Sequence, residues 1–127
     1  MRGALDGRSN LGADGEQAAA EHLARSGYRI LERNLRSRFG EIDIVAQHGG
    51  VLVFVEVRTR RSRAMAPEES ITPAKSRRLA LLGTRYLQEH HLEAADWRID
   101  VIAIERNARG ALVRLAHHIS AIEEPPG

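Results

Sequence analysis

IDIVAQHGGVLVFVEV, residues 42–57, decides the fold: two apolar runs, each carrying one acid, flank the pair Gly49-Gly50. A two-residue hairpin turn needs positive φ values, which glycine adopts without a steric penalty. If these glycines form the turn, the register places Asp43 opposite Glu56. Both runs are apolar at consecutive positions, which is typical of central strands covered by other elements on both faces.

The two acids on this hairpin predict a metal site. Like charges directly opposite each other destabilise a ladder, and an acid on a covered strand is costly to bury. A divalent cation between Asp43 and Glu56 would reverse that repulsion, because carboxylate oxygens are ligands that Mg²⁺ or Mn²⁺ prefers. The same register places Glu41 opposite Arg58 as a cross-strand ion pair. The simpler alternative is a solvated face that binds no metal.

Length and composition narrow the class of protein. The 127 residues fit one domain, for which we expect a flexible leader over 1–11, the domain over 12–122 and a tail over 123–127. Cysteine is absent, so disulfides, thiolate metal sites and a cysteine nucleophile are excluded. The sequence has no apolar run of about 18 residues and no secretion-signal core. We therefore expect a cytoplasmic protein with no membrane partner.

The distribution of charge is more informative than its sum. The net charge is only +2, from 19 basic and 17 acidic residues, but arginines cluster around the two apolar runs. Basic residues beside an acidic site suit a phosphodiester backbone, although they are also compatible with simple solvation. The candidate nucleic-acid-binding residues are Arg38, Arg60, Arg61, Arg63, Lys75 and Arg78. Only five residues are aromatic, which argues against extended base stacking on single strands.

A helix is predicted before the hairpin. Asp14 can cap it and Gly27 can end it, with Ala19, Leu23 and their neighbours as an apolar stripe. Glu16 lies on the inward edge of this stripe. It is either a partner of the helix dipole or a third carboxylate brought over the sheet toward the hairpin acids.

The rest of the chain completes an α/β pattern. Strands are predicted over 28–34, 97–104 and 111–115, and a second helix begins at Thr72-Pro73 and runs to about His91. Residues 60–71 have no periodicity and are expected to form a mobile loop. This order predicts a central mixed sheet of about five strands flanked by helices.

Several ordered blocks resemble the bacterial YraN family. They are GADGEQAA at 12–19, GYRILERN at 27–34, GEIDIV at 40–45, VFVEVRTR at 53–60 and RIDV at 98–101. That family resembles archaeal Holliday junction resolvases and belongs by similarity to the restriction-endonuclease-like nucleases. The resemblance spans roughly residues 12–105 and implies a restriction-endonuclease-like fold.

The resemblance also implies roles for individual residues. The nuclease motif is an acid on one strand, then an acid, any residue and a lysine on the next, with a glutamate on the first helix. Asp43 and Glu56 match the strand acids and Glu16 matches the helical glutamate, so these three are the implied Mg²⁺ or Mn²⁺ ligands, with the carbonyl of Val57. The implied catalytic residues are Asp43, Glu56 and Arg58. Arg58 stands at the lysine position and keeps the charge, but it cannot act as a base.

The expected activity is metal-dependent hydrolysis of DNA phosphodiester bonds, directed by DNA shape such as a branched Holliday junction. Junction cleavage needs two active sites, so a homodimer is expected for that activity. The alternative, favoured by Arg58, is a weakly active or inactive nucleic-acid-binding protein that retains the nuclease fold. A histidine metal site is disfavoured, because the pairs at 90–91 and 117–118 are adjacent and their members point in different directions.

Overall fold

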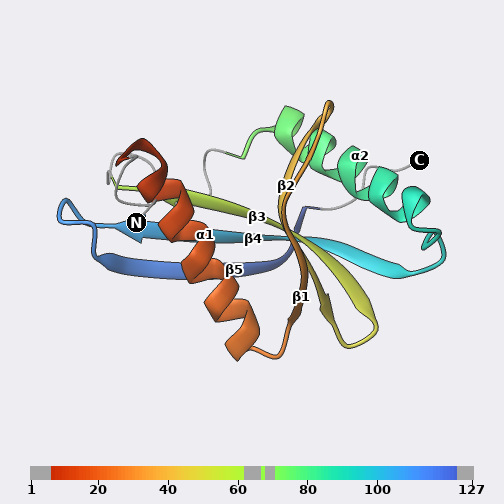
Figure 1. Ribbon diagram of the computed structural model, residues 1–127, viewed down its shortest axis with the longest axis horizontal. Helices are drawn as coiled ribbons and strands as arrows, with labels where there is room; N and C mark the ends of the chain where they lie inside the picture. Colours follow the sequence, from red (N-terminus) through yellow and green to blue (C-terminus); the bar gives the residue numbers. More distant parts are fainter. Residues whose placement is uncertain (1–6, 62–66, 68–70, 123–127) are drawn as a thin grey trace.

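The computed structural model describes residues 7–61, 67 and 71–122. Its elements are α1 (Gly7–Arg25), β1 (Arg29–Ser37), β2 (Gly40–His48), β3 (Val51–Arg60), α2 (Pro73–Glu89), β4 (Asp96–Arg106) and β5 (Leu112–Ile122). The five strands form one sheet in the order β1-β2-β3-β4-β5, in which β3 and β4 are parallel and the other neighbours antiparallel. The predicted α/β class with a mixed sheet flanked by helices is confirmed, and it is consistent with a restriction-endonuclease-like fold (Figure 1).

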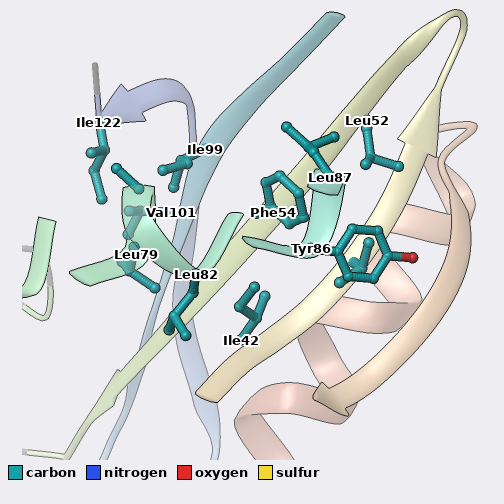
Figure 2. Packing of buried hydrophobic residues seen from close by; sticks show 12 residues of the cluster. Ile42, Leu52, Phe54, Leu79, Leu82, Tyr86, Leu87, Ile99, Val101 and Ile122 are labelled. Atoms are coloured by element: carbon teal, nitrogen blue, oxygen red, sulfur yellow. The ribbon is translucent and has the colours of Figure 1, made fainter. Parts of the chain in front are cut away.

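Each face of the sheet packs against one helix. Figure 2 shows the α2 side, where the buried residues include Ile42, Leu52, Phe54, Leu79, Leu82, Tyr86, Ile99 and Val101. The α1 side includes Ala19, Ala20, Leu23, Ile44, Val53, Val55, Ile102 and Ile104. Successive residues of β3 thus alternate between two covered faces, as predicted for a central strand. Within the described ranges, neither helix is long and apolar enough to cross a membrane.

The hairpin register is the one that the Gly-Gly turn predicts. The β2–β3 pairs run from His48 opposite Val51 to Ile44 opposite Val55. Of the two turn residues only Gly49 has a positive φ, of 61°. The expectation of positive φ at both glycines is therefore wrong for Gly50, and one left-handed residue is sufficient to reverse this chain.

On the N-terminal side of Ile44, strand β2 separates from β3. The alternation of apolar residues in the sequence did not predict this separation. The N-terminal residues of β2 stay paired with β1, where Glu41 lies opposite Arg36. The predicted pairing of Glu41 with Arg58 is therefore wrong. Ile42 and Val45 both belong to the α2-side core, although strict alternation would place them on opposite faces. Figure 1 shows the β1–β2 turn reaching toward α2 while β3 continues beside β4.

Several element boundaries differ from the predicted ones. Helix α1 begins at Gly7 instead of after a cap at Asp14, because helix propensity and capping are weak constraints within a longer helical segment. Strand β5 extends to Ile122, which pairs with Ile99 of β4. Helix α2 begins as predicted, since the Thr72 hydroxyl accepts the Lys75 N–H at 3.1 Å. Residues 1–6 of the predicted leader, most of the predicted loop and the tail over 123–127 lie outside the described residues.

Candidate metal centre

A recess of about 380 Å³ opens at the point where β2 and β3 separate. It is lined by residues from both helices and both strands, and its charged members are Glu16, Glu41, Asp43, Glu56, Arg58, Arg60, Lys75 and Arg78. The opening in the sheet is what allows α1 on one face and α2 on the other to contribute to the same recess.

Helix α1 brings Glu16 to this recess through a close contact with β3. A Cβ added at Gly15 would collide with the hydroxyl of Thr59, so glycine permits the helix to approach the strand. The neighbouring Glu16 then lies half-buried over the recess. Burial raises the pKa of its carboxyl, and the negative charge of Glu41 raises it further. The helical glutamate therefore points at the acidic strands, as the third-carboxylate alternative predicts.

Three carboxylates converge in the recess. Glu16, Glu41 and Asp43 each offer an oxygen atom within 4.8 Å of the other two. Asp43 accepts the backbone N–H of Val57 at 2.8 Å, across the gap where the ladder has ended. Burial, followed by the charge of Glu56, raises the pKa of Asp43 to about 8. Acids held this closely repel one another when ionised, and a divalent cation among their oxygens would relieve that repulsion.

Glu56 lines the same recess beside Asp43 but lies outside the cluster of three carboxylates. It is 9% exposed, close enough to Asp43 to raise its pKa, and its carboxylate accepts a hydrogen bond from Arg58 at 3.2 Å. Glu41 joins the carboxylate cluster instead and also pairs with Arg36 at 2.7 Å. Glu41 was not predicted as a ligand, because the prediction extended the β2–β3 pairing past Asp43 to Glu41.

The predicted nucleic-acid-binding residues fall into two groups. Arg60, Lys75 and Arg78 line the acidic recess. Arg38 lies in the β1–β2 turn with its guanidinium 5.0 Å from the centre of the Phe39 ring, and Arg61 is exposed just after β3. The remaining predicted residue, Arg63, lies outside the described residues.

A second polar network lies elsewhere, around the fully buried Asp100. Its carboxylate is hydrogen-bonded by Arg98 at 3.0 Å and by His117 at 2.8 Å, and it accepts the N–H of Ser120. Burial alone would raise the pKa of Asp100, but the hydrogen bonds from His117 and Arg98 outweigh it and lower the pKa.

The Nδ1 atom of His117 lies 3.0 Å from the Nε2 atom of His22 on α1. This network ties β4, β5 and α1 together on the side of the sheet that α1 covers. The sequence does indicate this network, because Asp100, like Glu56, is an acid on a strand that is apolar on both faces.

Comparison with known proteins identifies relatives over most of the chain. Residues 15–104 match an uncharacterised protein family, UPF0102. A UPF0102 protein of Symbiobacterium thermophilum is 54% identical over 103 residues, which are 80% of this chain and 87% of the relative. One from Roseiflexus castenholzii is 52% identical over 120 residues, covering 92% and 96%, and one from Chloroflexus aurantiacus is 49% identical over 118 residues, with the same coverage. The chain therefore belongs to the uncharacterised protein family UPF0102, in agreement with the YraN resemblance of its sequence blocks.

Proposed function

We propose that this protein is a metal-dependent nuclease that hydrolyses phosphodiester bonds in DNA. The observation that carries the proposal is the cluster of Glu16, Glu41 and Asp43, whose oxygens lie within 4.8 Å of one another. Basic side chains line the same recess as this cluster. Acidic metal ligands beside cations that neutralise phosphate are the combination that phosphodiester hydrolysis requires.

The donor set suits Mg²⁺ or Mn²⁺. Carboxylate oxygens from two elements, α1 and β2, are hard ligands, and among the described residues neither thiol nor imidazole groups line the recess. Glu16, Glu41 and Asp43 would hold the ion. A bound ion of this kind lowers the pKa of a water molecule and stabilises charge on the phosphate. Because the pKa of Asp43 is raised to about 8, metal binding at neutral pH would displace a proton from this carboxyl.

The basic residues would place the substrate. Arg60, at the end of β3, and Lys75 and Arg78, on α2, border the acidic recess from two sides. Contacts of this type hold phosphates without reading bases, so they favour recognition of DNA shape over sequence. A branched junction is the substrate that this reasoning favours, and its cleavage would require a homodimer that presents two recesses.

Arg58 would stabilise negative charge instead of transferring protons. Its guanidinium has N–H donors and no acceptor for a proton, so it cannot act as a general base. It lies beside Glu56, at the rim of the recess.

The contact between Arg58 and Glu56 favours a second candidate function, that of a DNA-binding protein without catalytic turnover. The ion pair of Glu56 with Arg58 at 3.2 Å occupies the carboxylate that the nuclease motif assigns to the metal. If this pair persists when DNA binds, the recess would hold phosphates and an ion without activating a water molecule.

Calorimetry and cleavage assays test both candidates. We expect Mg²⁺ and Mn²⁺ to bind the wild-type protein, and we expect binding to be lost in Asp43→Ala and weakened in Glu41→Gln. Glu93→Gln, which alters an exposed acid outside the recess, is the matched control and should bind metal normally. Labelled four-way junction, duplex and single-stranded DNA should then show metal-dependent cleavage that follows the same order. Intact DNA binding with no cleavage in any divalent metal would reject the nuclease and favour the second candidate.

A further inference from the structure

A second recess, of about 200 Å³, lies on the other side of the β1–β2 turn from the acidic recess. The side chain of Leu82 forms part of the wall of both recesses. The second recess is lined by a mixture of aromatic and charged side chains, among them Arg36, Phe39, Arg85, Tyr86, Glu89 and His90. We call it the aromatic recess.

Flat, polarisable groups surround the aromatic recess. The guanidinium of Arg85 lies 4.0 Å from the centre of the Phe39 ring, and the Phe39 side chain is still 38% exposed. The Tyr86 and His90 rings are stacked on each other with their centres 3.9 Å apart, and Tyr86 is only 5% exposed, so Phe39 and Arg85 offer the accessible planar surface. Ring faces and guanidinium planes are the surfaces on which nucleobases stack. The carboxylate of Glu89, on the same wall, can accept hydrogen bonds from the edge of a base.

The β1–β2 turn approaches α2 closely at Gly40. The N–H of Phe39 donates to the hydroxyl of Ser37 at 3.1 Å, which fixes the turn internally. Gly40 has φ of 142°, and a Cβ at this position would lie 3.1 Å from a methyl group of Leu82 and 3.2 Å from Arg78. Because Leu82 lines both recesses, the aromatic recess is next to the acidic one, and a strand bound at the acidic recess would pass near Phe39.

We infer that the aromatic recess binds one unpaired base of a nucleic-acid strand whose phosphates lie along the acidic recess. This inference rests on the proposed function, and it adds a contact to the base itself. A recess of this size accommodates a single base, which agrees with the small number of aromatic residues in the chain. A base that is already unpaired, at a bulge or a branch, enters at the lowest cost because it has the least stacking to lose.

Binding measurements with two labelled duplexes test this inference. One duplex is fully paired and the other carries a single unpaired 2-aminopurine, and both are titrated in EDTA so that no cleavage occurs. We expect the wild-type protein to bind the second duplex about tenfold more tightly, which is within the range of one stacked base, and to change the 2-aminopurine fluorescence. Phe39→Ala should remove this preference without changing the affinity for the paired duplex, and Phe39→Trp should retain it.

Two further variants separate this inference from the proposed function. Arg60→Ala, in the acidic recess, should weaken binding of both duplexes equally, because it removes a phosphate contact. Leu112→Ala alters an exposed apolar residue at the opposite edge of the sheet and should change neither affinity. Binding without a preference for the unpaired base, or a preference that survives Phe39→Ala, would overturn the aromatic-recess inference alone. Failure of the wild-type protein to bind either duplex would overturn the aromatic-recess inference, whereas the cleavage assay with divalent metal tests the nuclease separately.

Discussion

Replacing Asp43 with asparagine should stabilise the metal-free protein at neutral and alkaline pH. In the folded protein the pKa of this carboxyl is raised to about 8, from 3.8, mainly by burial and by the charge of Glu56. The folded state therefore binds more protons than the unfolded chain between about pH 4 and about pH 8, and stability falls as the pH rises through that window. Asparagine keeps an oxygen that can accept the N–H of Val57, but it has no proton to lose.

The size of the effect follows from the shift in pKa. A rise of about four pKa units at 1.36 kcal/mol per unit corresponds to about 5 kcal/mol as an upper limit. With a urea slope of about 1.5 kcal/mol per molar, this corresponds to a change in the unfolding midpoint on the order of 3 M. Burial, and then the charge of Glu41, raises the pKa of Glu16. The repulsion between Glu16 and Glu41 should therefore persist in the variant.

Urea unfolding in EDTA at about pH 5 and about pH 8 measures the prediction. The wild-type protein should lose stability between the two conditions, Asp43→Asn should lose much less, and Mg²⁺ should restore stability only to the wild type. Asp96→Asn, which changes an exposed acid at the start of β4, should behave like the wild type. If Asp43→Asn is no more stable than the wild type at about pH 8, or shows the same dependence on pH, the reasoning about this buried acid is wrong.

Three further predictions concern stability away from the metal centre. Asp100→Asn should cost about 3–5 kcal/mol, because it breaks a buried ion pair and leaves Arg98 and His117 without their carboxylate; thermal melting should show a large decrease, and a change within error would contradict the assigned network. Burial, and then the charge of His117, lowers the pKa of His22, so the contribution of this histidine to stability should fall as the pH drops below about 6.5, opposite in sign to the contribution of Asp43. In urea unfolding, the difference between the wild type and His22→Gln should therefore change between about pH 7 and about pH 5 in the direction that disfavours the wild type. Thr72→Ala should cost about 1 kcal/mol by removing the cap of α2, whereas Thr72→Ser should retain most of the stability in the same assay.

The Gly-Gly pair and the apolar runs on either side of it were sufficient to predict the central hairpin. The Gly49-Gly50 turn set the register through Ile44 opposite Val55, and the continuous apolar runs predicted a strand covered on both faces. The capping hydroxyl of Thr72 marked the start of α2. These features depend on residues close together in the chain, where turn geometry, alternation and capping act directly.

The composition of the candidate site could not be predicted to the same degree. The sequence identified Glu16, Asp43 and Glu56, which all line the recess, but it paired Glu41 with Arg58. The structure instead brings Glu41 into the carboxylate cluster. The β2–β3 pairing ends at Ile44 and Val55, so Glu41 does not lie opposite Arg58, and the periodicity of the sequence does not indicate where the pairing ends.

Residues close together in the chain thus specify the secondary structure of the core, the hairpin register and three of the acids that line the recess. Packing between distant segments specifies which carboxylates lie closest together, how Asp100 is neutralised and where Phe39 lies relative to α2. The difference lies in the range of the interactions. Turns, caps and alternation are fixed by neighbouring residues, whereas the site is assembled where the sheet opens, between helices that lie far apart in the chain.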